Sequence, residues 1–163
     1  MKQELYETLV NYIVQNQNKF YRLAFSYARN QEDALDIVQN SICKALDHYE
    51  SLNNEGAVKT WFYRILVNES IQFIHRRNRE LLSDDDLILD KPYYEEGYET
   101  QDDLYEQINH LHEDVQNIIK LRFYEEMSLQ EISEITQLNL STVKAKLYRG
   151  LKLLKQTMQE VEA

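Results

Sequence analysis

The fold is decided by residues 127–154, which read MSLQEISEITQLNLSTVKAKLYRGLKLL. Ser128 stands three residues before Glu131, the spacing of a capping box, in which each side chain accepts a hydrogen bond from the other residue's backbone N–H. Two isoleucines then form the apolar face of a short helix, and the polar stretch 137–140 interrupts the pattern. A capped helix of about eight residues, a turn and a second helix have the spacing of a helix-turn-helix.

The second helix of this pair is expected to begin near Ser141 and to carry a basic outer face. Residues 141–157 include five basic side chains and no acid. The apolar residues repeat at helical spacing and would face the core: Val143, Leu147, Leu151 and Leu154. The residues left on the outer side are Ser141, Thr142, Lys144, Ala145, Lys146 and Arg149. Small polar residues followed by long cations suit a reader of the DNA major groove; the alternative is a solvated basic face on an ordinary helix.

The net charge of −10 argues against a nucleic-acid partner only if the charge is evenly spread. The 163 residues hold 18 basic and 28 acidic side chains, but residues 1–81 are neutral overall and residues 105–163 carry only −2. Residues 82–104 carry −8 and contain the single proline. Dense acid with Pro and Gly is typical of a linker, so we predict a flexible acidic linker over residues 82–103.

The rest of the chain also has helical patterns, which makes the predicted fold class all-α. Three glycines and one proline are too few for the tight turns of most all-β folds. Before the linker, the apolar pattern predicts a break near residues 16–18, a helix capped by Asn30 and a later helix around Trp61. We therefore expect two small helical domains, residues 1–81 and residues 104–163.

Composition also bounds the chemistry and the compartment. Cys43 is the only cysteine, so no internal disulfide or thiolate zinc site is expected, and its apolar neighbours predict that it is buried. The sequence shows no run of about 18 apolar residues and no signal-peptide core, which favours a cytoplasmic protein. It shows no metal-ligand spacing and no phosphate loop, so we expect no metal, no cofactor and no small-molecule substrate.

A second candidate for nucleic-acid binding lies on the helix around Trp61. Aromatic and basic residues alternate there, which suits single-stranded DNA because bases stack on rings while phosphates meet cations. The cluster His75-Arg76-Arg77 ends the same helix. Two structural explanations stay open: Trp61 can belong to the core, and cations favour a helix C-terminus because of its dipole.

Three stretches together resemble the extracytoplasmic-function (ECF) group of the sigma-70 family of bacterial RNA polymerase sigma factors. They are FYRLAFSYARNQEDALDIVQNSICKAL (20–46), TWFYRILVNESIQFIHRRNR (60–79) and the stretch 127–154 quoted above. The first is closest to envelope-stress members of the sigma V type. The resemblance covers both predicted domains in order, which implies that they are sigma region 2 and sigma region 4. It implies a factor that directs core polymerase to promoters and is not an enzyme.

The resemblance also implies roles for individual positions. The family's D-x-V-Q motif docks on the clamp helices of the polymerase β′ subunit, and it implies core binding by Asp36, Val38, Gln39 and Asn40. Residues 51–56 match a loop that captures a flipped base of the −10 element. The expected −10 contacts are Asn53, Asn54, Lys59, Trp61, Arg64, Asn68, Arg76 and Arg77. The expected contacts to −35 duplex are Ser141, Thr142, Lys144, Lys146 and Arg149. For Val38, packing in the helical core is an equal alternative.

The expected partners are core RNA polymerase, through its β′ clamp helices and β flap, and promoter DNA. A membrane-anchored anti-sigma factor is implied by the resemblance alone. Two other functions stay open: a stand-alone helix-turn-helix regulator that acts on duplex DNA without polymerase, and a helical adaptor that binds only proteins. Neither explains the block at Asp36 and Gln39 or the aromatic-basic helix, so the sequence favours the sigma factor.

Overall fold

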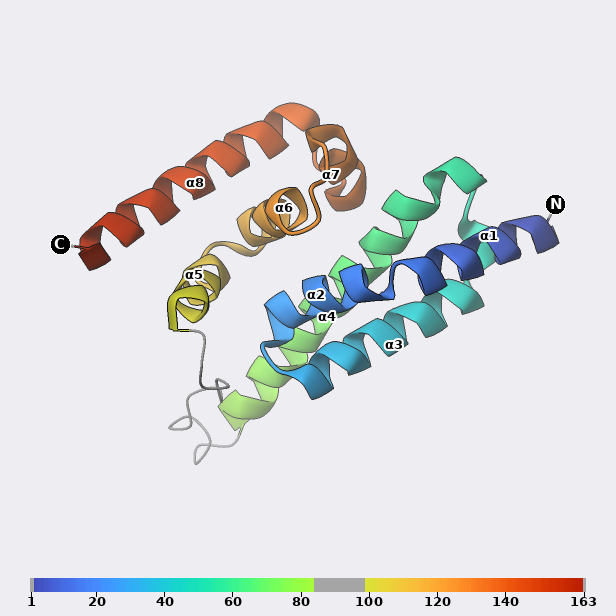
Figure 1. Cartoon of the computed structure of the whole chain (residues 1–163), viewed down its shortest axis with the longest axis horizontal. Helices are drawn as coiled ribbons and strands as arrows, with labels where there is room; N and C mark the ends of the chain where they lie inside the picture. Colours follow the sequence, from blue (N-terminus) through green and yellow to red (C-terminus); the bar gives the residue numbers. More distant parts are fainter. Residues whose placement is uncertain (1, 84–98, 163) are drawn as a thin grey trace. The chain divides into compact units, whose positions relative to one another are not determined.

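The computed structural model describes residues 2–83 and 99–162, with side chains for residues 2–81 and 104–157. The described residues form α-helices joined by short turns and two 3₁₀ turns, with no strand among them, so the predicted all-α class is confirmed (Figure 1). The chain divides into two compact units, residues 1–95 and residues 96–163. We describe each unit by itself.

The first unit contains four helices and two single 3₁₀ turns. Their bounds are α1 (Lys2–Gln15), α2 (Gln17–Ala28), α3 (Gln31–Asp47), η1 (Tyr49–Ser51), η2 (Glu55–Ala57) and α4 (Val58–Ser83). The break between α1 and α2 falls at Asn16, as predicted, and α2 ends at Arg29 in the left-handed conformation, with φ 66°. The predicted Asn30 cap is confirmed, because its side chain accepts from the Asp33 backbone N–H at 2.8 Å.

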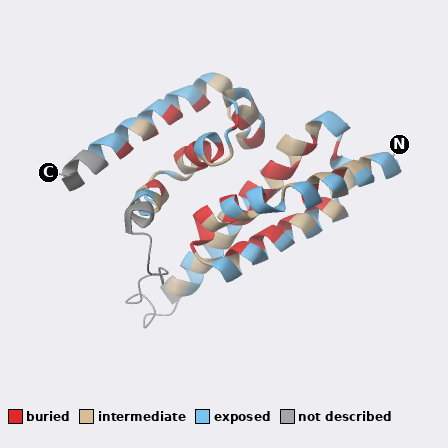
Figure 2. Cartoon of the chain, in the orientation of Figure 1, coloured by how far each residue is buried: buried red, intermediate tan, exposed pale blue. Residues whose placement is uncertain are grey.

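The core of the first unit lies between α2, α3 and α4, and α1 precedes α2 and packs on α3 and α4 (Figure 1). The faces that these helices turn toward one another are buried, whereas their outer faces are exposed (Figure 2). Aromatic rings form the centre: the centroids of Phe20 and Phe62 lie 4.3 Å apart, and those of Phe20 and Tyr63 lie 5.5 Å apart. Large aromatic side chains contribute much of the burial energy of a small core.

The second unit contains α5 (Glu99–Asn109), α6 (Glu113–Phe123), α7 (Leu129–Thr136) and α8 (Leu140–Glu162). The capping box at the start of α7 is confirmed, with the Ser128 and Glu131 side chains each bonded to the other's backbone N–H at 3.1 and 3.0 Å. Gln137 ends α7 in the left-handed conformation, with φ 63°. Asn139 Oδ1 then accepts from the Thr142 backbone N–H at 3.0 Å, which fixes the start of α8.

α6 and α8 approach each other closely because α8 carries a glycine at their contact. A Cβ atom built on Gly150 would lie 2.4 Å from Val115 Cγ1 and 2.9 Å from Ile119 Cδ1, both on α6. α6 also carries a fully buried cation, Lys120, whose Nζ donates to Asn109 Oδ1 at 2.8 Å. The Lys120 bond joins α6 to the end of α5, and the glycine contact sets the position of α8 against α6.

The two ends of the predicted linker are helical. α4 continues to Ser83 and α5 begins at Glu99, whereas residues 84–98 lie outside the described residues. Good helix formers at Glu80, Leu81 and Leu82 extend α4 past the predicted boundary. α4 thus extends two residues into the predicted linker range, and α5 covers its last five residues.

Candidate nucleic-acid interface

α8 separates a buried apolar stripe from an exposed basic face, as the sequence predicts. Val143, Leu147 and Leu154 are buried, and all of Ser141, Lys144 and Arg149 are exposed. Thr142 and Lys146 are half-buried. Because α7 and α8 pack as the predicted helix-turn-helix, the N-terminal half of α8 presents hydroxyl groups and cations together. This arrangement can bond phosphates and the edges of bases in a major groove.

The cations on this face differ in their local electrostatics. Lys146 Nζ lies 3.1 Å from Asp114 Oδ2 at the start of α6, and the two side chains are 27% and 43% exposed. The carboxylate offsets part of the field of Lys146. Lys144 and Arg149 are exposed on the same helix, so their charge is available to a polyanion.

An exposed aromatic residue on α8 was missing from the predicted site. Tyr148 is 67% exposed, the largest fraction among the exposed large apolar side chains of the described residues. It follows Lys144 by four residues and therefore lies on the same face of the helix. The signal was present in the sequence, since Tyr148 falls outside the apolar stripe that Leu147 and Leu151 continue.

On α4, the aromatic and polar residues expected to meet the −10 element share one face. Trp61, Arg64 and Asn68 follow one another at spacings of three and four residues, and Arg76 continues this face two turns later. Trp61 and Arg64 are half-buried, whereas Asn68 and Arg76 are exposed. Trp61 is thus neither a buried core residue nor a fully exposed one. The face offers a ring, cations and an amide along one line, which suits a single strand.

Two of the predicted −10 contacts lie on a different side of α4. Lys59 and Arg77 are each about 160° away from Trp61 around the helix axis, at about 100° per residue. Arg77 Nη1 donates to the Ala28 carbonyl at 2.8 Å, and its guanidinium lies 5.5 Å from the Phe73 ring centroid. Arg77 therefore ties α4 to the C-terminal end of α2. Arg77 has this packing role, and the −10 contacts expected for Arg77 and Lys59 stay predictions.

The loop before α4 presents two exposed asparagines on a fixed base. Leu52 is buried and anchors the segment between η1 and η2, while the two residues that follow it, Asn53 and Asn54, are exposed. A Cβ atom on Gly56 would lie 3.2 Å from Asn54 Oδ1, so the glycine leaves room for this amide. Amide groups can donate to and accept from the edge of an unstacked base.

α3 exposes three of the four residues predicted to bind polymerase. Asp36, Gln39 and Asn40 are exposed, whereas Val38 is 7% exposed and packs in the core. For Val38 the packing alternative therefore holds, because the helical period places it on the inner face beside Ile37. Two neighbours on the outer face were not predicted: Leu35 is exposed, and Cys43 is exposed rather than buried, so that expectation was wrong.

Other chemistry finds no support in the described parts of the chain. No group of three His, Cys, Asp or Glu residues there is arranged to hold a metal ion. None of the helices described is both long and apolar enough to span a membrane. The features that remain are three exposed surfaces: the face of α3, the loop with α4, and the face of α8.

Family models match both units of the chain. The model for sigma-70 region 2 covers residues 12–80, and the model for sigma-70 region 4 covers residues 101–154. The RNA polymerase sigma factor SigV of Bacillus subtilis is 44% identical over 154 residues, which span 94% of this chain and 93% of that protein. The ECF RNA polymerase sigma-E factor of Haemophilus influenzae is 29% identical, over 88% of this chain and 83% of that protein.

Solved structures share the fold at lower identity. The sigma factor RpoE from Bartonella quintana, solved in complex with the anti-sigma factor NepR, matches with a TM-score of 0.70 and 23% identity, covering 97% of this chain and 96% of that one. CnrH, solved with the cytosolic domain of CnrY, matches with a TM-score of 0.74 and 14% identity, covering 93% and 88%. The two family models and the SigV relative place this chain in the sigma-70 family of RNA polymerase sigma factors, in its ECF group.

Proposed function

We propose that this ECF sigma factor directs core polymerase to its promoters through the three exposed surfaces described above. The face of α3 binds core polymerase, the Asn53–Asn54 loop and the Trp61 face of α4 bind the melted −10 strand, and the outer face of α8 reads the −35 duplex. The factor supplies binding energy and catalyses no reaction. It acts in the cytoplasm, where polymerase and chromosomal DNA meet.

One observation carries this proposal: the exposed face of α8 is basic in a protein of net charge −10. Residues 141–157 hold five cations and no acid, and Lys144 and Arg149 are exposed in the N-terminal half of the helix. A solvated face of an acidic protein has no need to exclude acids over this length. A surface that meets phosphates does, because each acid would repel them.

The −35 assignment is tested by in vitro transcription with purified core polymerase, first to map the start sites that the factor selects. Lys144→Ala is then compared with Lys155→Ala, which removes the same charge from an exposed position three turns later on α8. We expect Lys144→Ala to reduce transcription from −35-dependent start sites and Lys155→Ala to leave it nearly unchanged. Equal effects of the two variants would refute the assignment of the N-terminal half of α8 to DNA.

The polymerase assignment is tested separately. Asp36→Ala with Gln39→Ala removes two exposed polar groups from α3 and leaves the core intact, so we expect weaker binding to core polymerase at an unchanged melting temperature. The matched control is Gln3→Ala with Glu7→Ala, an exposed amide and acid on α1. If both double variants bind core polymerase as the unsubstituted protein does, α3 is not the interface.

We extend the proposal to an inhibitory partner. Both solved structures described above contain the matching protein in complex with a second protein, and in one of them the pair is named as a sigma factor and an anti-sigma factor. A protein of this kind that covers the outer faces of α3 and α8 would block polymerase and DNA together. Affinity purification of the full chain under non-inducing growth tests this point, and recovery of polymerase alone would contradict it.

A stand-alone helix-turn-helix regulator would bind duplex DNA without polymerase. The acidic charge of the chain opposes such binding, since the mean field around the protein repels DNA. We therefore expect weak duplex binding by the isolated factor. Tight and sequence-specific binding without polymerase would favour the regulator instead.

A further inference from the structure

We propose that Glu69 is a positioning residue: through its ion pair with Lys44 it holds the polymerase-binding helix α3 in register with the −10-binding helix α4. The inference rests on the proposed function, because it links two of its three surfaces. Glu69 itself touches neither partner. Its effect is that polymerase bound on α3 favours the arrangement of α4 that captures the −10 strand.

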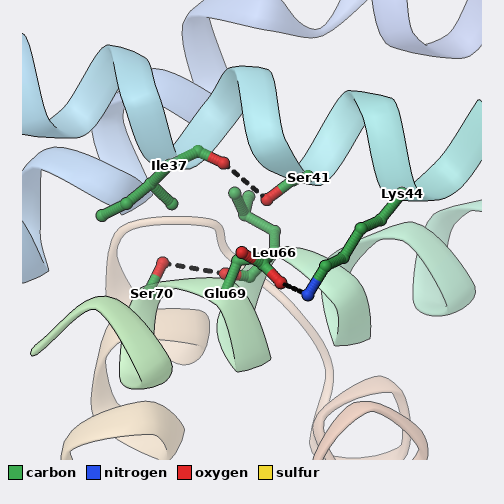
Figure 3. Close-up of polar contacts among 6 residues, drawn as sticks. All are labelled: Ile37, Ser41, Lys44, Leu66, Glu69 and Ser70. Carbon is green, nitrogen blue, oxygen red and sulfur yellow. Dashed lines mark hydrogen bonds and ion pairs between the residues drawn. The ribbon is translucent and has the colours of Figure 1, made fainter. Parts of the chain in front are cut away.

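The first observation is a carboxylate buried between two helices. Glu69 is 4% exposed on α4, and Lys44 of α3 is the partner that the described structure gives it (Figure 3). A buried charge is costly unless it is paired in good geometry. The pair therefore favours packing of α3 and α4 that keeps the Lys44 ammonium group within reach, since a large shift of α3 along α4 would leave the carboxylate without its partner.

The second observation is that the surrounding contacts between α3 and α4 have little directional character. Ser41 and Ser70 are fully buried near the pair, but each donates its hydroxyl within its own helix, to the carbonyls of Ile37 and Leu66 at 2.8 Å (Figure 3). Apolar contacts are non-directional, so they tolerate small shifts between helices. A charged pair specifies one register, which is the best-attested role of such groups in a core.

The third observation is where the two ends of the pair lie. Asn68, directly before Glu69, is exposed on the proposed single-strand face. Asn40, one turn before Lys44, is exposed on the proposed polymerase face. The Lys44 side chain is 50% exposed, whereas that of Glu69 is 5% exposed. The pair thus reaches from the edge of the polymerase surface to the inner side of the −10-binding helix.

This placement gives a physical route for coupling. Polymerase docked on α3 removes water from around Lys44, and attraction between charges strengthens as the local dielectric falls. The register held by the pair then becomes more favourable when polymerase is bound. Coupling of this kind is reciprocal, so a bound −10 strand must also tighten the binding of polymerase.

The test removes the charges and preserves the packing. In Lys44→Met/Glu69→Met, two flexible apolar side chains of similar length replace the pair, a change that often keeps or raises stability. The control is Lys2→Met/Glu50→Met, which removes the ion pair between α1 and η1, whose side chains are 76% and 62% exposed. The affinity of each full-length protein for core polymerase is measured with and without a non-template oligonucleotide that spans a mapped −10 element.

For the unsubstituted protein and the Lys2/Glu50 control, we expect the oligonucleotide to tighten polymerase binding by about fivefold or more, the lower end of typical coupling. For Lys44→Met/Glu69→Met we expect the oligonucleotide to have almost no effect on polymerase binding. The melting temperature of this variant should stay close to that of the unsubstituted protein. Full tightening in this variant would overturn the inference. Absence of tightening in the unsubstituted protein would instead overturn the proposed −10 function, so the two failures are distinguishable.

A second variant keeps the inference testable if the double substitution impairs folding. Glu69→Gln retains the shape of the side chain and an oxygen that accepts from Lys44, but it removes the charge. We expect it to reduce the oligonucleotide-dependent tightening in part while core polymerase alone binds normally. An unchanged tightening factor in Glu69→Gln would contradict a role for the charged pair.

Discussion

The substitution Gly150→Ala tests whether close packing of α8 on α6 overrides helix propensity. In the interior of an exposed helix, replacing Gly by Ala stabilises by about 1 kcal/mol. At position 150 the new Cβ atom would lie 2.4 Å from Val115 Cγ1 and 2.9 Å from Ile119 Cδ1. Carbon atoms in contact normally stand about 3.5–4.0 Å apart, so one of the two helices must move.

The expected change in stability on Gly150→Ala depends on how far the contacting side chains on α6 can move. Val115 is β-branched and has one strongly preferred rotamer in a helix, so it cannot simply turn away. Overpacking of this kind costs about 1–3 kcal/mol. With about 2–3 kcal/mol for the clash and a gain of about 1 kcal/mol from propensity, we expect a net loss of about 1–2 kcal/mol in the second unit. A displaced α8 should also weaken −35 binding by the holoenzyme.

Hydrogen exchange of peptides from α6 and α8 measures this loss locally. A loss of about 1.4 kcal/mol lowers protection of globally exchanging amides about tenfold. Fluorescence of Trp61, the single tryptophan, reports the first unit and serves as the internal control. Adding Val115→Ala to Gly150→Ala should relieve the clash, so the double variant should lose less stability than the sum of the two single losses. Increased protection in Gly150→Ala would refute the reasoning, because it would mean that propensity outweighs the contact.

Substitutions at the cap of α7, at the end of α4 and on α8 give distinct outcomes. Ser128→Ala removes one half of the capping box and should cost about 1 kcal/mol, read as faster hydrogen exchange in α7; unchanged exchange would contradict a stabilising cap. Arg77→Met should lower the stability of the first unit by about 1–2 kcal/mol, followed by Trp61 fluorescence, because it loses the bond to the α2 terminus, whereas the exposed Arg76→Met should not. Lys144→Ala should reduce the slope of the logarithm of the −35 binding constant against the logarithm of the salt concentration by about one unit. Lys146→Ala should reduce this slope by less, because a carboxylate already neutralises Lys146 in part. A larger reduction for Lys146→Ala than for Lys144→Ala would argue against this electrostatic explanation.

The local features of the fold could be predicted from the sequence. The capping box at Ser128, the cap at Asn30 and the break at Asn16 each depend on residues within a few positions of one another. The same holds for the apolar stripe of α8, which places its basic residues outside by helical period alone. The all-α class and the ECF sigma-factor family could also be predicted, because the helical patterns and the family motifs lie in contiguous stretches of the sequence.

Other roles depend on contacts between helices, which only the tertiary structure decided. Val38 is held in the core, and Arg77 bonds to the Ala28 carbonyl at the end of α2. Lys146 has part of its charge neutralised by a residue from another helix. Glu69 gave no signal in the sequence, because its partner Lys44 lies 25 residues away and only the packing of α3 against α4 brings the two charges together. Spacing along the chain fixes which side of a helix a residue occupies, but the neighbours that cover that side are set by long-range packing.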